Sequence, residues 1–328
     1  MKILVRLPNW LGDMVMSTGF LQALQTVYPN ATIDVIAKKG LDQLTSFIPG
    51  INHTYVFSRD EWKGLRGVYG FGKKIRSGEK YDLFFCLPDS FSSACMAWAT
   101  DAKQRVGFEK ELRSLFLTKS FTKPPSLHRV EQYVSLLEQF SNTHIPALSI
   151  LLKSKVTTVA NRVIINFNSE AISRRMPVDK AASIFARLLL QMPTAEFVCI
   201  GSAKEKEHVD AVLQKLGRQS AVINKAGSTN SLAELVDLIA SGSMMLTTDS
   251  GPAHIGNALG VPVVVLFGAG NENNTAPYNK KSLTILRLGQ LPCEPCVKNT
   301  CIYGLPKCLE QLDEHKITKA VSNYLSFK

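Results

Sequence analysis

The sequence predicts an α/β protein with two Rossmann-like domains, each built on a parallel sheet. Three observations support this prediction. With 328 residues, the chain is about twice as long as an ordinary compact domain. Short apolar runs alternate with amphipathic stretches, as strands alternate with crossover helices in such sheets. The alternation stops at a polar stretch, residues 153–161, and then begins again. We therefore expect an N-terminal domain over residues 1–155, a C-terminal domain over 156–310, and a final helical segment over 311–328 that packs back on the body.

Runs rich in branched and aromatic residues predict the strands of the first half, at Ile3–Leu7, Thr32–Ile36 and Tyr81–Leu87. Between the first two strands, apolar residues recur with the spacing of one buried helix face, and Asn30 ends that helix. The residues of this face are Phe20, Ala23, Leu24, Val27 and Tyr28. The only dense glycine run, residues 64–72, has polar and basic neighbours and is expected to be a loop.

The second half repeats the alternation of strands and helices. Its predicted strands are Arg162–Phe167, Glu196–Gly201, Ser243–Thr247 and Val261–Phe267. Its predicted helices are Val178–Leu190, Glu205–Leu216, Ser231–Ala240 and Ala253–Leu259, followed by Leu312–Leu325 at the C-terminal end.

Composition and charge narrow the functional class. Hydrophobic residues make up 45% of the chain and charged residues 20%, which is typical of globular proteins. No apolar run approaches the roughly 18 residues that a membrane-spanning helix needs, and the N-terminus lacks the features of a secretion signal, so we expect a cytoplasmic protein. The net charge of +11 suggests an anionic partner: nucleic acid, a phosphorylated substrate or an acidic membrane. No nucleic-acid-binding module is recognisable, and no G-x-G-x-x-G run follows a strand, which disfavours a dehydrogenase.

The seven cysteines argue against a disulfide framework, because their number is odd and no export signal precedes them. Three of them, Cys86, Cys95 and Cys199, lie in apolar stretches and are expected to be buried thiols. The other four form a C-x2-C-x4-C-x6-C cluster, Cys293, Cys296, Cys301 and Cys308. The cluster is dense enough for a tetrahedral zinc site if all four thiolates converge, but its spacing matches no standard zinc module, so reduced thiols are the favoured interpretation.

Two segments follow predicted strands directly and are candidates for a ligand site, because ligands of open α/β sheets bind at the carboxyl ends of strands. Asp13 lies where a helix starts after the first strand, so it is equally interpretable as a helix cap. The segment Thr248–His254 is again a strand end, a tight turn and a helix start. Gly251 allows close approach of the backbone, and Pro252 suits a first helical turn. A helix start of this kind is a site for phosphate, while Asp249 is also interpretable as a cap.

Five segments in order along the chain resemble the signature blocks of the bacterial lipopolysaccharide heptosyltransferases, glycosyltransferase family 9. They are Trp10–Ser17, Leu87–Phe91, His128–Tyr133, Arg174–Pro177 and Asp249–His254. The resemblance therefore covers nearly the whole chain. It implies a GT-B fold of two facing Rossmann-like domains, with Asp13 and the Thr248–His254 segment at one cleft. It also implies an inverting enzyme that moves heptose from ADP-heptose to the lipopolysaccharide inner core without a metal or other cofactor.

The same resemblance implies roles for individual residues. Asp13 would be the general base that takes the proton of the acceptor hydroxyl. Arg174 stands where the family has a phosphate-contacting lysine and would stabilise the leaving diphosphate. Donor-binding roles would fall to Ser169, Glu205, Asn230, Ser231, Leu232, Asp249 and Ser250, and to the backbone N–H groups of Gly251 to His254.

Basic residues of the first domain are candidates for contact with an anionic lipid-linked acceptor at the cytoplasmic face of the inner membrane, although most such charges only face solvent. They are Lys63, Arg66, Lys73, Lys74, Arg76, Lys80, Arg105 and Arg113. The chain also departs from the family pattern: Asp89 replaces an asparagine, Ser92 stands where a lysine is common, and Met176 replaces a tryptophan. Two other functions therefore stay open, a GT-B enzyme with a different nucleotide sugar and a non-catalytic nucleotide-sugar-binding protein.

Overall fold

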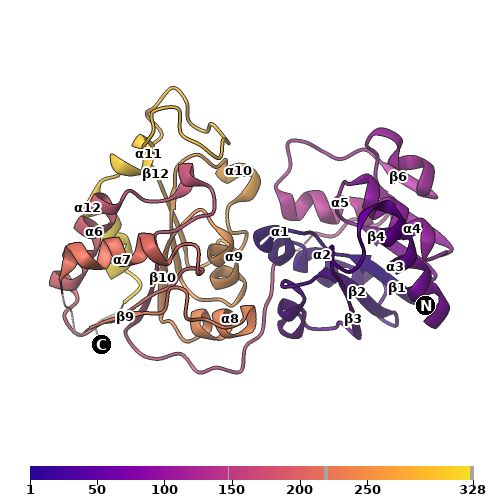
Figure 1. The fold of residues 1–328 in the computed structure, drawn as a ribbon, viewed down its shortest axis with the longest axis horizontal. Coiled ribbons are helices and arrows are strands. Elements are labelled where there is room, and N and C mark those ends of the chain that lie inside the picture. Colours follow the sequence, from indigo (N-terminus) through magenta and orange to yellow (C-terminus); the bar gives the residue numbers. More distant parts are fainter. Residues whose placement is uncertain (147, 218–220, 326–328) are drawn as a thin grey trace. The chain divides into compact units, whose positions relative to one another are not determined.

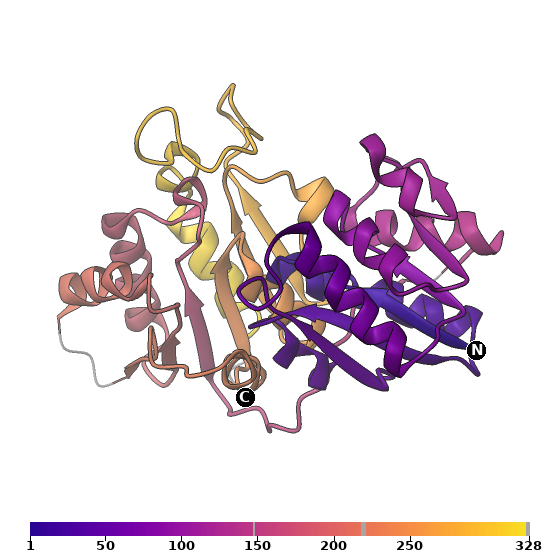
Figure 2. The same cartoon turned by 45° about the vertical axis from the view of Figure 1, so that its right-hand side comes forward.

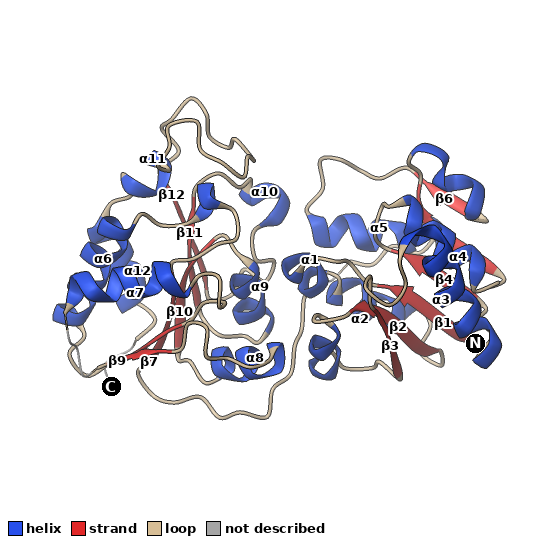
Figure 3. Ribbon diagram, viewed as in Figure 1, coloured by secondary structure: helices blue, strands red, loops and turns tan. Residues whose placement is uncertain are grey.

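The computed structural model describes residues 1–146, 148–217 and 221–325. The chain divides into two compact units, which we call unit 1, Met1–Lys153, and unit 2, Ser154–Lys328 (Figure 1). Each unit contains a six-stranded sheet in which all strand pairs are parallel. Helices flank the strands of each sheet, as the colouring in Figure 3 shows. The prediction of an α/β protein with two doubly wound parallel sheets is confirmed. Among the described residues, no helix combines the length and apolar character needed to cross a membrane.

Unit 1 runs through the following elements: β1 (Lys2–Arg6), α1 (Leu11–Met16), α2 (Thr18–Val27), β2 (Thr32–Lys38), η1 (Asp42–Phe47), β3 (His53–Phe57), α3 (Gly64–Gly78), β4 (Leu83–Cys86), α4 (Phe91–Ala99), β5 (Gln104–Phe108), η2 (Glu111–Phe116), β6 (Lys119–Phe121) and α5 (Arg129–Ser141). Successive residues of β4 point to opposite faces of the sheet. Phe84 packs in a core with Val68 and Phe71 of α3, whereas Phe85 contacts Phe20 of α2 and Phe140 of α5. The two faces of the sheet are thus buried by different helices.

The glycine run at 64–72 was wrongly predicted as a loop, because it lies in the 15-residue helix α3. Val68, Phe71 and Ile75 of this helix are buried on the sheet, and this burial outweighs the poor helix propensity of glycine. Gly72 also has a packing role. A Cβ atom there would lie 2.7 Å from the carbonyl oxygen of Met96, so only glycine lets α3 and α4 approach this closely.

Unit 2 runs through β7 (Arg162–Asn166), η3 (Ile172–Arg174), α6 (Val178–Gln191), β8 (Glu196–Cys199), α7 (Lys206–Leu216), β9 (Val222–Asn224), α8 (Leu232–Ala240), β10 (Met244–Thr248), α9 (Gly251–Ala258), β11 (Val263–Phe267), α10 (Glu272–Thr275), β12 (Leu283–Arg287), α11 (Lys307–Glu310) and α12 (Glu314–Ser322). The last helix contacts α6 and buries Ile317 and Val321 in the core of this unit. Between β12 and α11 the chain extends beyond the sheet as a loop (Figures 1 and 2). We call residues 289–306 the cysteine loop.

The predicted strands and helices of both halves are confirmed with shifts of a few residues at their ends, except that the first helical stretch is two helices, α1 and α2. Missing from the prediction were β3, β5, β6, β9 and β12. Several of these lie toward the outside of their sheets and carry polar residues, so their apolar signal is short. The prediction that Cys86, Cys95 and Cys199 are buried thiols is confirmed as well.

Strand order fixes where a ligand can bind in each unit. In unit 1 the order is β3-β2-β1-β4-β5-β6, and in unit 2 it is β12-β11-β10-β7-β8-β9. The chain leaves the sheet centre in one direction from β1 and in the other from β4, and it does the same from β7 and β10. Such a switch point leaves a crevice outside the carboxyl ends of the two central strands. Asp13 follows β1 and Asp249 follows β10, so each predicted carboxylate lies at the switch point of its unit, although β1 is the first strand of unit 1 and β10 the fourth strand of unit 2.

Candidate functional site

Hydrogen bonds from a buried arginine hold the loop after β1 in place. Arg6, with 3% of its surface exposed, donates hydrogen bonds to the carbonyl oxygens of Leu7 and Ile36 and to Oδ1 of Asn9. The helix that follows begins with Trp10 as its N-cap, and no side chain caps it. Asp13 is the third residue of α1, so its interpretation as a helix cap is wrong. Its carboxylate is therefore available for another task.

Two side chains of α5 contact the Asp13 carboxylate. Nε of Arg129 lies 3.4 Å from Oδ1 of Asp13, and the Tyr133 hydroxyl forms a hydrogen bond with the same carboxylate. Residues four apart on a helix share one face, which explains why this pair reaches one target. The helix start itself is fixed by a capping box in which the His128 side chain and the Glu131 carboxylate bind each other's backbone N–H groups. The family-like segment His128–Tyr133 thus combines helix-starting residues with residues that contact Asp13.

Burial raises the pKa of Asp13, because a carboxylate loses hydration when it leaves water. The cations Arg129 and Lys123 and the Tyr133 hydrogen bond oppose this effect and lower the pKa, while the neighbouring Asp89 raises it. Burial also raises the pKa of Tyr133 well above its usual range, so this hydroxyl keeps its proton and donates it. The Asp13 side chain is 27% exposed, so this carboxylate combines a raised pKa with access to solvent.

A second carboxylate, Asp89, follows β4 on the other side of the switch point of unit 1. Nζ of Lys123 lies 2.7 Å from its Oδ2, and Nη1 of Arg113 lies 3.8 Å from its Oδ1. Asp89 is where the sequence departs from the asparagine of the family pattern, and the structure places a lysine and an arginine beside the additional charge. Unit 1 therefore presents two carboxylates and three cations at one point of the sheet.

Three of the arginines predicted to contact an acceptor have other roles. Arg113 is 1% exposed and donates to the carbonyl oxygens of Phe108 and Pro88, so this prediction is wrong for Arg113. Arg105 donates to the carbonyl oxygens of Ala102 and Phe116, and Arg76 pairs with Asp101. The remaining predicted cations, Lys63, Arg66, Lys73, Lys74 and Lys80, are exposed.

In unit 2 the carboxylate at the switch point is deeply buried. Asp249 follows β10 and has 4% of its side-chain surface exposed, and Ser250, not Asp249, is the N-cap of α9. The interpretation of Asp249 as a helix cap is therefore wrong. Nη1 of Arg174 lies 3.4 Å from its Oδ2, and burial raises the pKa of Asp249 against the opposing charges of Arg174 and Arg287. The predicted residues Arg174 and Asp249 thus meet as an ion pair.

A glycine makes room for this pair. A Cβ atom at Gly270 would lie 2.0 Å from Oδ2 of Asp249, a distance that real structures do not show, so a side chain there would displace the carboxylate. Arg287 holds the same stretch by donating to the carbonyl oxygens of Gly268 and Gly270. It also pairs with Glu272 at 2.6 Å and Glu294 at 3.4 Å. Unit 2 therefore surrounds Asp249 with fixed groups.

The turn that carries Arg174 is tied to the cysteine loop. The backbone N–H of Ser173 donates to the carbonyl oxygen of Asn299, and its hydroxyl donates to the carbonyl oxygen of Lys298. Ser173 is buried, whereas Arg174 keeps about one quarter of its side-chain surface exposed. Arg174 is thus held at its backbone and accessible at its guanidinium.

Hydrogen bonds at the switch point of unit 2 fix the start of α9. Nδ2 of Asn166 donates to the hydroxyls of Thr247 and Ser250, and the hydroxyl of Thr248 donates to the carbonyl oxygen of Asn168. The Ser250 hydroxyl therefore has partners within the protein. His254 is buried in α9.

Fewer backbone donors are available at this helix start than the sequence suggested. Pro252 lies in the first turn, as predicted, and has no N–H, and the N–H of Ala253 donates to the carbonyl oxygen of Ser250. The prediction that all N–H groups from Gly251 to His254 bind a diphosphate is wrong in this respect. The Arg174 guanidinium, five donors in one plane, is the stronger candidate for that role.

The other predicted donor-binding residues lie beyond the carboxyl ends of β7, β8 and β9. Ser169 is buried, and its carbonyl oxygen accepts from Arg175. Glu205 is the N-cap residue of α7 and accepts from the N–H of Ser202, so it has a local role as well. Ser231 caps α8 by accepting from the N–H of Glu234, whose carboxylate accepts from the N–H of Asn230; Leu232 is the first residue of α8. These residues share one edge of the sheet, and their contact with a nucleotide stays a prediction.

Three of the four clustered cysteines, Cys293, Cys296 and Cys301, lie in the cysteine loop and are partly exposed, whereas Cys308 follows it in α11 and is buried. Burial raises the pKa of Cys308 to about 11, so this thiol is protonated. Within the described part of the chain, no group of three or more His, Cys, Asp or Glu residues is arranged to hold a metal ion. The four cysteines line one pocket together with Ser173 and Ala269.

Comparison with known proteins decides the family. A family model described as glycosyltransferase family 9 (heptosyltransferase) matches residues 68–306. The chain belongs to glycosyltransferase family 9. This family 9 chain is 30% identical over 313 residues to lipooligosaccharide heptosyltransferase 2 of Haemophilus influenzae, covering 88% of this chain and 89% of the relative. It is 29% identical over 313 residues to lipopolysaccharide heptosyltransferase 2 of Escherichia coli, covering 87% and 88%.

A solved structure agrees with these relatives. The ADP-heptose lipopolysaccharide heptosyltransferase II of E. coli matches with a TM-score of 0.83 and 26% identity, over 99% of this chain and 98% of that one. The resemblance to this family, predicted from five sequence segments, is confirmed. The predictions of a GT-B fold and of a glycosyltransferase are confirmed as well.

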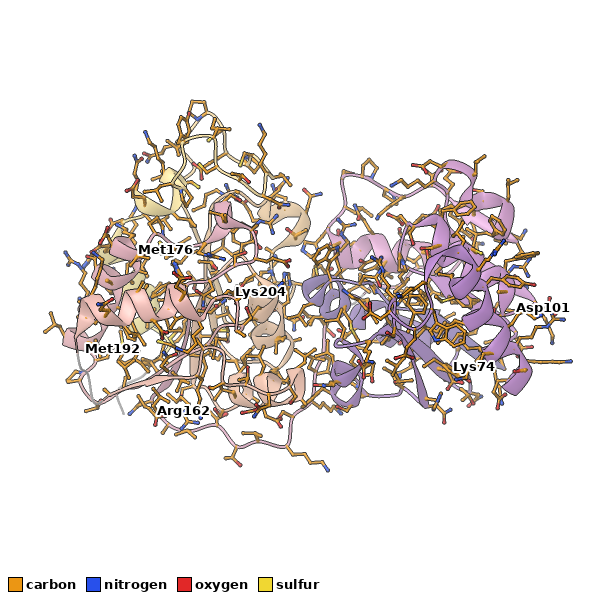
Figure 4. The ribbon with its side chains drawn as sticks, in the orientation of Figure 1. Lys74, Asp101, Arg162, Met176, Met192 and Lys204 are labelled. Carbon is orange, nitrogen blue, oxygen red and sulfur yellow. The ribbon has the colours of Figure 1, made fainter. Side chains whose placement is uncertain are left out.

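One departure from the family pattern has a structural explanation. Met176 of the family 9 chain is fully buried in the core of unit 2, together with Met192 (Figure 4). Its side chain is part of that core. A methionine in place of the family's tryptophan therefore affects core packing next to the Arg174 turn and leaves the polar groups of that turn unchanged.

Sequence reasoning missed several residues that contact the predicted carboxylates. The pairing of Arg129 and Tyr133 could have been predicted, because a capping box marks the start of their helix and the two residues lie four apart on it. Gly270 and Arg287 carried no local signal, since they reach the Asp249 region from later parts of the chain, the loop after β11 and the end of β12. Lys123, in a loop between β6 and α5, carried none either.

Proposed function

We propose that the chain is an inverting glycosyltransferase that transfers L-glycero-D-manno-heptose from ADP-heptose to the heptosyl-Kdo-lipid A inner core of lipopolysaccharide. The observation that carries the proposal is the match over 98% or more of both chains to a heptosyltransferase II named for ADP-heptose. The candidate sites of the two units support the proposal independently, because each unit has a carboxylate with a raised pKa and neighbouring cations at its switch point.

Asp13 is the proposed general base. Its carboxylate is accessible, burial raises its pKa, and Tyr133 and Arg129 orient it. In the reaction, Asp13 takes the proton from the acceptor hydroxyl while that oxygen forms a bond to the anomeric carbon of the heptose. The bond from the anomeric carbon to the diphosphate breaks at the same time, and its electron pair leaves with ADP. Attack opposite to the leaving group inverts the anomeric centre.

Arg174 is the proposed partner of the leaving diphosphate. Negative charge grows on the bridging oxygen and the β-phosphate as the bond breaks, and a guanidinium fixed in place lowers the energy of that charge. The Asp249 ion pair and the two hydrogen bonds of Ser173 hold Arg174 in a turn before the donor arrives. Asp249 then acts by positioning Arg174. Glu205, Asn230, Ser231 and Leu232 are the proposed residues around the adenosine.

The proposed reaction uses no cofactor and no metal, because Asp13 supplies the base and Arg174 the positive charge. We further propose that the protein is cytoplasmic and meets its lipid-linked acceptor at the cytoplasmic face of the inner membrane. A net charge of +11 favours approach to an anionic leaflet.

The test is a donor and acceptor matrix with the purified full chain. ADP-heptose and UDP-glucose are each offered with heptosyl-Kdo-lipid A and with Kdo-lipid A, in the presence and absence of EDTA. Nucleotide release is followed, and the acceptor mass is measured. We expect ADP release and a mass increase of one heptose with ADP-heptose and heptosyl-Kdo-lipid A, unaffected by EDTA.

The matrix separates the possible failures. Transfer from UDP-glucose without transfer from ADP-heptose contradicts the donor assignment. Transfer to Kdo-lipid A in preference to heptosyl-Kdo-lipid A contradicts the acceptor assignment. Nucleotide-sugar binding without any turnover indicates a binding protein.

A further inference from the structure

An aromatic cluster lies at the surface of unit 1, where α3, α4 and η2 meet. Trp98 of α4 contacts Tyr69 of α3 at a ring-centroid distance of 5.4 Å and Phe116 of η2 at 5.6 Å. Phe91, at the start of α4, contacts the same Phe116 at 5.1 Å. Trp98 is nevertheless 48% exposed, so the cluster is a surface feature held in place by ring contacts.

Aliphatic side chains project from the same elements. Leu112 and Leu115 lie three residues apart in η2, and side chains with this spacing in a 3-10 helix lie on one side of it. They are 68% and 79% exposed, and Leu65 of α3, one turn before Tyr69, is 52% exposed. Arg105 holds η2 in place by donating to the carbonyl oxygen of Phe116. We call Leu65, Tyr69, Trp98, Leu112, Leu115 and Phe116 the α3–η2 surface.

The charge around this surface is mainly positive, although Glu111 of η2 is exposed beside Leu112. Helices α3 and α4 contain no acidic residue, whereas α3 contains Arg66, Lys73, Lys74 and Arg76. Nζ of Lys73 lies 5.9 Å from the ring centroid of Tyr69, so this cation borders the cluster directly. Arg76 pairs with Asp101, which leaves Arg66, Lys73 and Lys74 as the exposed cations of α3; Figure 4 marks Lys74 and Asp101 on this side of unit 1.

We infer that the α3–η2 surface is a docking site for an anionic lipid bilayer. Exposed leucines can enter the boundary between headgroups and acyl chains, where tryptophan and tyrosine are also favoured because one end of their rings is apolar and the other polar. Lysine and arginine beside them pair with anionic headgroups. A protein partner fits less well, because lysine is depleted in the cores of protein interfaces.

This inference rests on the proposed function only in one respect, namely that a lipid-linked acceptor gives the enzyme a reason to be at a membrane. The docking surface belongs to unit 1, which also carries Asp13. Docking would therefore bring the unit with the proposed base to the leaflet in which the acceptor is held.

The test is sedimentation of the purified full chain with vesicles, without donor or acceptor. We expect binding to vesicles of phosphatidylethanolamine with phosphatidylglycerol, weaker binding at high salt, and little binding to phosphatidylcholine alone. The L112S/L115S variant should lower the partition coefficient about tenfold or more, because two leucines no longer enter the lipid. The matched control is L190S, since Leu190 lies in α6 of unit 2 and is 82% exposed.

A second pair of variants tests the charges. K73Q/K74Q should lower the partition coefficient by about fivefold for each cation removed, and more at low than at high salt. K316Q/K319Q is the control, because these two exposed lysines lie on α12 of unit 2. All seven residues changed in these variants are exposed, and unchanged thermal unfolding of each variant shows that its fold is intact.

Three results would overturn the inference. They are equal binding to neutral and anionic vesicles, binding that L112S/L115S leaves unchanged, and a change in the association state of L112S/L115S without vesicles, which would indicate a protein interface. The assay is independent of catalysis. Vesicle binding without heptose transfer leaves the docking site in place and removes only the proposed function, and heptose transfer to a detergent-dispersed acceptor by L112S/L115S separates the two in the other direction.

Discussion

The two carboxylates at the switch points differ in how much of their surroundings is fixed. Asp13 is 27% exposed and pairs with Arg129 at 3.4 Å, the same distance at which Asp249 pairs with Arg174. Asp249 is 4% exposed and lies against Gly270, and Arg287 holds the backbone of that stretch. Burial raises the pKa of both, yet only Asp13 keeps an accessible side chain. The comparison teaches that a raised pKa does not by itself identify a base; accessibility separates the proposed base from the carboxylate that we propose to position an arginine.

Replacement of Asp13 should give the largest effect. Asp13→Asn keeps the shape of the side chain but removes the proton acceptor, so we expect turnover to fall by about 10²-fold or more. ADP-heptose affinity, measured by calorimetry, should stay nearly unchanged because the proposed donor residues lie in unit 2. Asp60→Asn, at an exposed carboxylate of the same unit, is the control. A variant with wild-type turnover would assign Asp13 to the support of Arg129 and Tyr133 alone.

The fixed surroundings of Asp249 are tested by Gly270→Ala. The added Cβ would lie 2.0 Å from Oδ2 of Asp249, so the carboxylate and the Arg174 pair must move. We expect a loss of about 1–3 kcal/mol in the free energy of unfolding, together with weaker ADP binding. Chemical denaturation and calorimetry measure the two effects. Gly78→Ala is the control, because an added Cβ there meets nothing within 4 Å. If Gly270→Ala binds ADP as the wild type does, Asp249 does not position the donor site.

The smallest effect is expected for Tyr133→Phe. Its hydroxyl lowers the pKa of Asp13, so its removal raises that pKa. A general base works when deprotonated, and the rate falls as the pH drops through its pKa; the acid limb of the kcat profile should therefore move to higher pH. Turnover on the alkaline plateau should change by less than about threefold, since Asp13 is deprotonated there with or without the hydroxyl. A plateau that drops while the acid limb stays in place would contradict this role.

How much of the fold and of the site could be predicted from the sequence depends on whether a feature is set by neighbouring residues or by distant ones. The strand-end loops at Asp13 and Asp249, the proline at the start of α9 and the order of strands and helices were all predictable, because each depends on neighbouring residues. The contacts of Asp249 with Gly270 and of Asp89 with Lys123 depend on chain segments about 20 to 35 residues away, so no local pattern announced them. The prediction of a loop at the glycine run of α3 failed for a related reason. Helix propensity is weak compared with burial of Phe71 and Ile75 against the sheet.

The two hydrogen bonds of Ser173 to the cysteine loop have a consequence for how the sequence can vary. Both accept at main-chain carbonyl oxygens, those of Lys298 and Asn299, so the side chains at these positions take no part. Substitutions at Lys298 and Asn299 should therefore leave the turn that carries Arg174 in place, provided that the path of the backbone and the Ser173 hydroxyl are kept. At this edge of the site, the length and shape of the loop matter more than the side chains at these two positions.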